Sequence, residues 1–311
     1  MAATATIGVT GPAGGWPAVT YRQAGDQYVM IEYGEHELDL RLNFLVVSVL
    51  DRLTTDPPPG LVEAAPGLRS ILVRFDPRRT GRDALIERLR ATHDAQPDIT
   101  SLVLPSRVIT LPIAFDDTSC REAVRRYVTT IRPDAANTAG GSNIDYIVEQ
   151  TGFPTAEALY AAVTGTELWT AFTGFAPGLP FLLPLEPGLG LSVPKYNPTR
   201  GWTAEGSVGL GGPCAAIYPV ESPGSYQLLG RTVPIYDMVG HHPAFATDPF
   251  LVRPADRVHF TRVSERELRD ARKQVFEGRY RYRIAEEPFS VADHLARWGH
   301  DPSRAAGTGA G

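Results

Sequence analysis

The chain of 311 residues suits two domains of ordinary size, and its 43% hydrophobic content is enough for real cores. A net charge of −5 argues against a nucleic-acid or anionic-membrane partner. Its two cysteines, Cys120 and Cys214, cannot form a disulfide framework or a four-ligand zinc site and suggest a reducing cytosol. We see no apolar run near the roughly 18 residues of a spanning helix and no signal peptide, so we expect a cytoplasmic protein.

The first part of the chain alternates strand and helix patterns. Residues 1–19 are rich in Gly, Ala and Thr and are expected to be a disordered tail. We predict a small α/β domain over 20–110, with helices on one face of a sheet. The strand-like runs are 28–33, 70–75 and 108–113, and helical spacing of apolar residues covers 38–53 and the segment around Leu85 and Leu89.

The second part changes character. Helical patterns occupy 118–166, and short strands with Pro- and Gly-rich turns fill 168–262, which indicates a closed or partly closed β-barrel. Ser264 and Glu267 form a capping box that predicts a helix start. The fold class is therefore α+β, with a barrel domain over 111–285 that carries a helical insertion, and a C-terminal helix and tail over 286–311.

Several common signatures are missing or weak. No phosphate-loop pattern exists, and we interpret the glycines of 209–212 as barrel turns rather than as a dinucleotide fingerprint. The adjacent His241 and His242 favour a solvated turn over a metal site, and Ser222 favours a turn over a nucleophile elbow. Cys214 is expected to be a small core residue. We expect neither a metal nor a nucleotide on this chain.

The most informative segment is 193–237, where Pro, Gly and Asn punctuate short apolar runs. Lys195, Arg200 and Arg231 fall in or beside its turns and are donors suited to a carboxylate, a carbamate or an enolate-like oxygen. Glu221 and Gln227 could hydrogen-bond an amide or ureido group. The alternative is that these side chains are rim ion pairs and turn caps of a barrel.

The same segment resembles the carboxyltransferase half of urea carboxylase, a family also called allophanate hydrolase subunit 1. This family has two further members: the B subunit of bacterial 5-oxoprolinase and the kinase-inhibitor protein of sporulation signalling. The matching stretches are 195–200 (KYNPTR), 202–209 (WTAEGSVG), 217–219 (IYP), 221–232 (ESPGSYQLLGRT), 21–26, 69–70, 106–107, 142–144 and 253–258 (RPADRV). The stretch 173–181 (TGFAPGLPF) is similar to the 5-oxoprolinase branch.

The resemblance implies a cyclophilin-like barrel that shares its active site with an allophanate hydrolase subunit 2-type protein. It also implies biotin on another chain, supplied by biotin carboxylase and biotin carrier proteins, because this sequence has no Met-Lys-Met biotinylation site. Carboxyl transfer to urea or a related amide or guanidine would use Lys195, Arg200 and Arg231 as catalytic cations. Its substrate-binding residues would be Asn197, Tyr218, Glu221 and Gln227.

Two other functions remain open from the sequence. One is an ATP-coupled 5-oxoprolinase component whose nucleotide site lies on partner chains. The other is a non-enzymatic regulator that binds a histidine kinase.

Overall fold

The computed structural model describes residues 6–12 and 16–299, which form two compact units. One unit ends at Pro105 and resumes at Pro288, and the other spans Ser106–Glu287. The expected C-terminal tail from residue 301 onward lies outside the described residues. Within 6–12 and 16–299, no helix combines the length and the apolar character needed to cross a bilayer.

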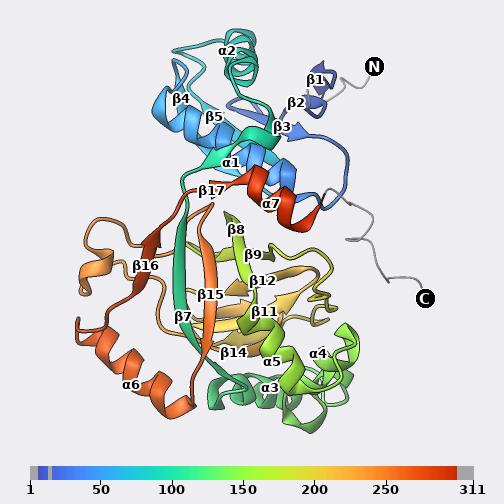
Figure 1. Cartoon of the computed structure of the whole chain (residues 1–311), viewed down its shortest axis with the longest axis vertical. Helices are drawn as coiled ribbons and strands as arrows, with labels where there is room; N and C mark the ends of the chain where they lie inside the picture. Colours follow the sequence, from blue (N-terminus) through green and yellow to red (C-terminus); the bar gives the residue numbers. More distant parts are fainter. Residues whose placement is uncertain (1–5, 13–15, 300–311) are drawn as a thin grey trace. The chain divides into compact units, whose positions relative to one another are not determined.

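The first unit is built on an antiparallel sheet with the order β1-β2-β3-β5-β4 (Figure 1). The central strand β3 buries every second side chain, at Val29, Ile31 and Tyr33, as expected for a sheet with one covered face. The strands are β1 (Thr6–Thr10), β2 (Val19–Gln23), β3 (Tyr28–Tyr33), β4 (Leu61–Pro66) and β5 (Ser70–Phe75).

Helices complete this unit. Asp39 caps α1 (Leu40–Thr55) by accepting a hydrogen bond from the Arg41 amide, and a Pro-rich turn follows the helix. Helix α2 (Arg82–Asp94) packs on the buried face of the sheet, where His93 hydrogen-bonds to Tyr21 and Tyr33. The remaining elements are η1 (Ile99–Ser101), β6 (Val103–Leu104), β17 (Phe289–Ser290) and α7 (Val291–Trp298), with β17 paired to β6.

The second unit is a β-barrel. Its sheet has the order β14-β11-β12-β9-β8-β15-β7-β16, and the additional pairing of β14 with β7 closes it. The α+β fold with a β-barrel is therefore confirmed. The strands are β7 (Arg107–Phe115), β8 (Glu167–Thr173), β9 (Pro180–Pro184), β11 (Ser207–Gly211), β12 (Cys214–Ile217), β14 (Gln227–Arg231), β15 (Arg257–Arg262) and β16 (Arg283–Glu286), with a separate ribbon of β10 (Arg200–Thr203) and β13 (Ser222–Gly224).

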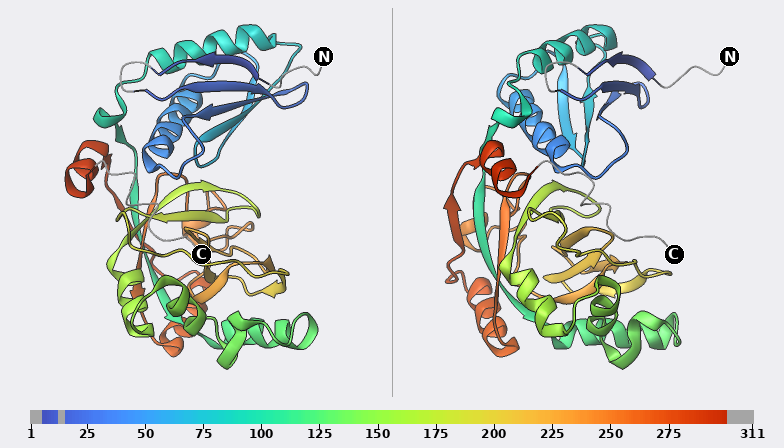
Figure 2. Two further views of the ribbon diagram at one scale, coloured as in Figure 1. Left: turned by 90° about the vertical axis from the view of Figure 1, so that its right-hand side faces the viewer. Right: turned by 45° about the vertical axis from the view of Figure 1, so that its right-hand side comes forward.

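The predicted helical insertion follows β7 and is gathered at one end of the barrel (Figures 1 and 2). It consists of α3 (Thr118–Thr130), η2 (Ala136–Gly141), α4 (Ile144–Thr151) and α5 (Ala156–Gly165). The predicted capping box also forms, since the Ser264 hydroxyl accepts from the Glu267 amide and the Glu267 carboxylate accepts from the Ser264 amide. It begins α6 (Glu265–Phe276), and the short η3 (Pro243–Phe245) lies earlier, before β15.

Two expectations differ from the structure. The run 108–113 is not a strand of the N-terminal layer, because β7 pairs with β15 and β14 of the barrel, and a boundary after residue 110 would divide that strand. Strand β1 lies inside the segment expected to be a disordered tail. It is held by backbone pairing to β2, for example Val9 with Thr20, and such pairing requires few large side chains.

Candidate active site

Glycines of β11 make room for a tyrosine that precedes the neighbouring strand. Strand β11 pairs with β14, and a Cβ atom on Gly211 would lie 2.3 Å from the ring of Tyr226. A Cβ atom on Gly209 would lie 3.0 Å from the Tyr226 Cβ. The interpretation of these glycines as turns therefore holds only for Gly212, which has a φ of 59° after the strand. Gly209 and Gly211 instead permit close packing.

Lys195 lies beside the tyrosine that these glycines accommodate. Its Nζ atom is 5.2 Å from the centre of the Tyr226 ring, within the range of a cation–π contact. Lys195 is exposed, and it has no hydrogen bond or ion pair to any residue that the structure describes. The sequence contains one other lysine, Lys273. The Lys195 ammonium is therefore available to an external anion.

Arg200 contacts the same tyrosine but is buried, with 1% of its surface exposed. Its Nη1 donates to the Tyr226 carbonyl oxygen at 2.5 Å, and its Nη2 donates to the Thr203 hydroxyl at 3.1 Å. Its guanidinium carbon is 4.3 Å from the centre of the Tyr196 ring. Arg200 therefore holds the backbone that carries Tyr226 and contributes positive charge from below the surface.

Tyr218 completes this group, which we call the Tyr226 cluster: Lys195, Tyr196, Arg200, Tyr218 and Tyr226. Tyr218 is buried, and a Cβ atom on Gly224 would lie 2.4 Å from its hydroxyl oxygen. Burial raises the pKa of Tyr218, while Arg200 and the Tyr226 backbone oppose that rise. The hydroxyl is thus protonated at neutral pH and can donate a hydrogen bond.

The wall beside Lys195 is apolar. Leu179, Ala216, Tyr218 and Tyr226 pack together, and the half-buried Cys214 lies against them. Burial raises the pKa of the Cys214 thiol to about 11, although Lys195 lowers it, so the thiol is protonated at neutral pH. This part of the site can exclude water but offers no thiolate nucleophile.

Two of the predicted amide-binding residues lie in contacts within the chain. Gln227 is 1% exposed, donates to the Pro194 carbonyl at 2.8 Å and accepts from Asn137 at 2.9 Å. It therefore fixes the loop that precedes Lys195. Asn197 has an exposed side chain, and its backbone carbonyl accepts from Arg132 at 3.2 Å.

Arg231 belongs to a different set of contacts. Its Nε donates to the Glu205 carbonyl at 2.7 Å, and its Nη1 donates to the Ser119 hydroxyl at 2.8 Å. The Glu205 carboxylate lies between Arg231 and Arg272, which also donates to the Thr232 carbonyl. Burial, and then the charge of Arg272, lower the pKa of Arg231. Its partners are not those of the Tyr226 cluster.

Glu221 is exposed just before β13, and it has no ion pair with the residues in the described ranges. The structure thus brings Lys195, Arg200 and Tyr218 together around Tyr226, but it gives Arg231 separate partners.

Reasoning from the sequence missed two residues of this site. One is Tyr226 itself. The other is Asn143, whose amide donates to the Tyr196 hydroxyl at 2.6 Å and whose side-chain oxygen accepts from the Leu228 amide at 2.9 Å. Both residues lie inside the matching stretches. A motif, however, does not reveal which of its members the other site residues pack against.

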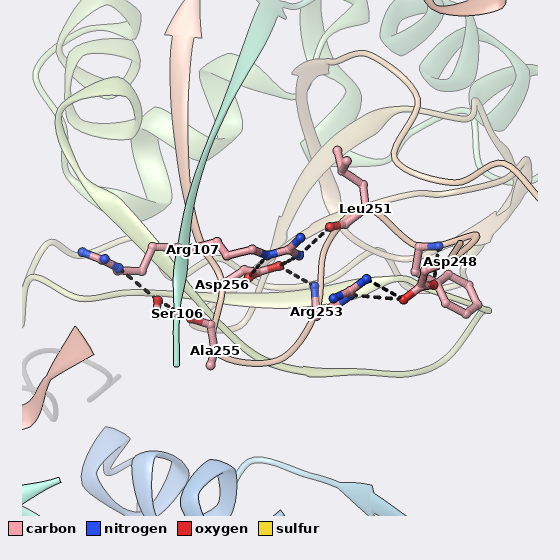
Figure 3. Close-up of polar contacts among 9 residues, drawn as sticks. Ser106, Arg107, Asp248, Leu251, Arg253, Ala255 and Asp256 are labelled. Atoms are coloured by element: carbon pink, nitrogen blue, oxygen red, sulfur yellow. Dashed lines mark hydrogen bonds and ion pairs between the residues drawn. The ribbon is translucent and has the colours of Figure 1, made fainter. Parts of the chain in front are cut away.

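The motif 253–258 has a structural role, which Figure 3 shows. Arg107 at the start of β7 binds the Asp256 carboxylate with Nε at 2.8 Å and Nη2 at 2.5 Å, and it also donates to the Leu251 carbonyl at 2.9 Å. The Arg253 amide donates to Asp256 at 2.7 Å, and the Arg253 side chain pairs with Asp248 at 3.0 Å. We call these residues the Arg107 cluster. Each charged side chain in it has a partner of opposite charge.

The histidine pair differs from the prediction of a solvated turn. His242 is buried, its Nδ1 accepts from the Ala244 amide at 3.1 Å, and its Nε2 lies 2.7 Å from the Tyr280 carbonyl oxygen. It caps η3 in place of the usual short polar side chain, whereas His241 is exposed. No group of three or more metal-ligating side chains occurs in the part of the chain that the structure covers.

The sequence of the chain is similar to that of several known proteins. Residues 19–246 match the model of the carboxyltransferase domain, subdomain C and D. The chain is 33% identical to urea amidolyase of Saccharomyces cerevisiae over 282 residues, 91% of this chain and 15% of that protein. It is 30% identical to the B subunit of 5-oxoprolinase from Escherichia coli O157:H7 over 213 residues, 67% of this chain and 80% of that protein.

A solved structure agrees with these matches. Urea carboxylase of Kluyveromyces lactis superposes with a TM-score of 0.82 at 32% identity, over 94% of this chain and 26% of that chain. This chain therefore spans only a small part of the urea amidolyase and urea carboxylase relatives. The predicted resemblance is confirmed, and the chain belongs to the carboxyltransferase domain family, subdomain C and D.

Proposed function

We propose that this chain is one part of a biotin-dependent carboxyltransferase of the urea-carboxylase type, which transfers a carboxyl group to urea or a related amide or guanidine. The observation that carries the proposal is the similarity to urea amidolyase over 91% of the chain, at 33% identity. Because the chain corresponds to 15% of that protein, biotin carboxylation and the biotin carrier would reside elsewhere. An allophanate hydrolase subunit 2-type partner would complete the site.

Lys195 fits the main chemical requirement of such a reaction. Carboxybiotin, held on another chain, would supply the activated carboxyl group. Lys195 would bind the oxygen on which negative charge develops, since its ammonium is exposed beside an apolar wall. A fixed cation stabilises such an oxygen more strongly when a partner surface excludes water.

The two arginines would have different roles. Arg200 would orient Tyr226 through its carbonyl and add positive potential near Lys195. Arg231 remains a candidate donor, since 21% of its side chain is exposed. Its contacts with Glu205 and Ser119 would have to rearrange before it could bind substrate with those same nitrogens.

Acceptor recognition would fall to Glu221 and Tyr218. The exposed Glu221 carboxylate can accept a hydrogen bond from the N–H groups of urea. Tyr218 is 2% exposed, so its surroundings would have to rearrange before its protonated hydroxyl could donate to a carbonyl oxygen. Gln227 and Asn197 would act indirectly, by fixing the loop around Lys195.

The test uses the tagged chain purified with its native partners. We expect ATP hydrolysis that depends on bicarbonate and is stimulated by urea or guanidine, and we expect avidin, which sequesters biotin, to abolish it. Stimulation that persists in full with avidin would contradict biotin dependence. A complex in which neither acceptor stimulates turnover would contradict the proposed substrate class.

One observation favours a second candidate, a component of a 5-oxoprolinase. The B subunit of the Escherichia coli O157:H7 enzyme is matched over 80% of its own length at 30% identity, so most of that protein has a counterpart in this chain. In that case the same complex would hydrolyse 5-oxoproline with ATP, and avidin would have no effect. The single assay therefore separates the two candidates.

A further inference from the structure

The loop between β8 and β9 carries an exposed aromatic ring on a strained backbone. Phe175 lies in this loop, and 73% of its surface is exposed. Its φ is 66°, in the left-handed region that a bulky side chain rarely adopts. Such strain persists only where the surrounding structure enforces it, and it is typical of functional sites. Neither an exposed ring nor a strained backbone stabilises the barrel, so Phe175 calls for a different explanation.

The loop is held in this conformation by its own backbone and by a neighbouring ring. The Gly174 amide donates to the Leu179 carbonyl at 3.0 Å and so closes the loop. Gly178 has a φ of 71°, and a Cβ atom there would lie 2.3 Å from the Phe250 ring. The exposed position of Phe175 is therefore a consequence of how the loop is packed.

The residues that follow Phe175 belong to the apolar wall beside Lys195. Leu179 is a buried member of that wall together with Tyr226, and Ala176 packs against the same cluster. The Lys195 Nζ lies 5.2 Å from the centre of the Tyr226 ring. Because Phe175 directly precedes Ala176, it lies at the rim of the wall and adds aromatic surface on the side open to solvent.

A cation beside an apolar wall with an aromatic rim suits a ligand that has a polar group and an apolar ring. Urea and guanidine have no such ring, so contact with Phe175 would bury little hydrophobic surface. The head group of carboxybiotin differs from them. Its ureido ring offers an oxygen that can accept a hydrogen bond from Lys195, and its fused sulfur-containing ring is apolar.

On the basis of the carboxyltransferase function proposed above, we propose that Phe175 is a specificity residue for the carboxyl donor. Its ring contacts the sulfur-containing ring of the biotin head group, while Lys195 binds the ureido oxygen. Loss of the Phe175 ring therefore weakens the biotin head group about tenfold and leaves binding of the acceptor unchanged.

Two neutral probes test the contact by binding alone: D-biotin methyl ester, and 2-imidazolidinone, which has the ureido ring but no sulfur-containing ring. Saturation-transfer NMR is recorded on the full chain assembled with its allophanate hydrolase subunit 2-type partner, without biotin carboxylase, which has a biotin site of its own. We expect a Kd on the order of 1 mM for the ester. Phe175→Ala should reduce this affinity about tenfold, toward that of 2-imidazolidinone. Equal affinity of the ester for Phe175→Ala and the unmodified complex, or no saturable binding, would overturn the proposal.

Kinetics of the holoenzyme separate the carboxyl donor from the acceptor. Phe175→Ala should lower kcat about tenfold and leave the acceptor KM unchanged, and Phe175→Leu should restore part of the rate. Phe276→Ala removes another phenylalanine, 70% exposed on α6, and should change neither parameter. A raised acceptor KM with normal kcat would assign Phe175 to the acceptor instead. Loss of the partner from Phe175→Ala in size-exclusion chromatography would assign it to a protein interface, and either result overturns the proposal.

Phe175→Gly separates function from folding. Glycine adopts a φ of 66° without strain, so the midpoint of urea denaturation should not fall, while affinity for the ester falls as in Phe175→Ala. A fall in both would show that Phe175 is structural. Turnover that avidin leaves intact would contradict the proposed function and this inference together. An avidin-sensitive holoenzyme in which Phe175→Ala behaves as unmodified would contradict this inference alone.

Discussion

The barrel unit contains two groups of charged side chains that use their charges differently. In the Arg107 cluster, Arg107 forms an ion pair with Asp256, and the nearby Arg253 forms one with Asp248. In the Tyr226 cluster, the buried Arg200 donates a hydrogen bond to the Tyr226 carbonyl oxygen and so has a structural role. Lys195, beside the Tyr226 ring, is exposed. Both groups lie in stretches of the family motif, so a shared motif marks either architecture or chemistry. Only the partners of each charge separate the two roles.

Removing one charge from the Arg107 cluster should give the largest effect on stability. Asp256→Ala leaves Arg107 partly buried without its carboxylate, and we expect the free energy of unfolding to fall by about 3 to 5 kcal/mol. Chemical denaturation measures this loss.

Arg253→Ala is the control for this variant, because 52% of the Arg253 side chain is exposed and its pair with Asp248 should contribute about 1 kcal/mol or less. Equal effects of Asp256→Ala and Arg253→Ala would remove the structural role that we assign to the Arg107–Asp256 pair.

The position of Tyr226 can be perturbed from the neighbouring strand. Gly211→Ala places a methyl group 2.3 Å from the present position of the Tyr226 ring, so the ring must move, and we expect a loss of about 1 to 3 kcal/mol. Gly201→Ala is matched, since a Cβ atom there meets nothing within 4 Å. If thermal unfolding shows the same midpoint for both variants, the close packing of Tyr226 on β11 is wrong.

A smaller effect is expected on the reactivity of Cys214, because Lys195 lies close enough to influence its thiol. Because the pKa of this thiol is raised to about 11, its rate of alkylation by iodoacetamide should rise about tenfold with each pH step of one between pH 7 and 10. Lys195 lowers this pKa, so Lys195→Ala should raise it and slow the reaction at a given pH. An unchanged or faster reaction in Lys195→Ala would contradict this effect of Lys195 on the thiol.

Much of the fold could be predicted because local patterns encode it. The apolar run 28–33 identified β3, the Ser264–Glu267 spacing marked the start of α6, and turn residues identified the barrel. The assignment of 108–113 to the first unit failed, because an apolar run does not specify which strand it pairs with. Pairing depends on residues about 150 positions away in β15.

The candidate site was predicted less completely. Lys195 and Arg200 lie in one hexapeptide and have the same charge, and nothing local to the sequence distinguishes them. Arg200 is buried because it reaches the Tyr226 carbonyl, which is distant in sequence, and stacks on Tyr196. Lys195 lies beside the Tyr226 ring and faces solvent. The division between a structural and an available cation is therefore a tertiary property.

The most direct measurement compares the two lysines of the chain in the assembled complex. Lys195→Ala and Lys273→Ala each remove one exposed ammonium, and each should change the free energy of unfolding by about 0.5 kcal/mol or less. We predict that acceptor-dependent carboxyl transfer falls by about a hundredfold or more in Lys195→Ala and is unchanged in Lys273→Ala. Near-normal transfer by a folded, assembled Lys195→Ala complex would contradict the role of the Tyr226 cluster as the catalytic site.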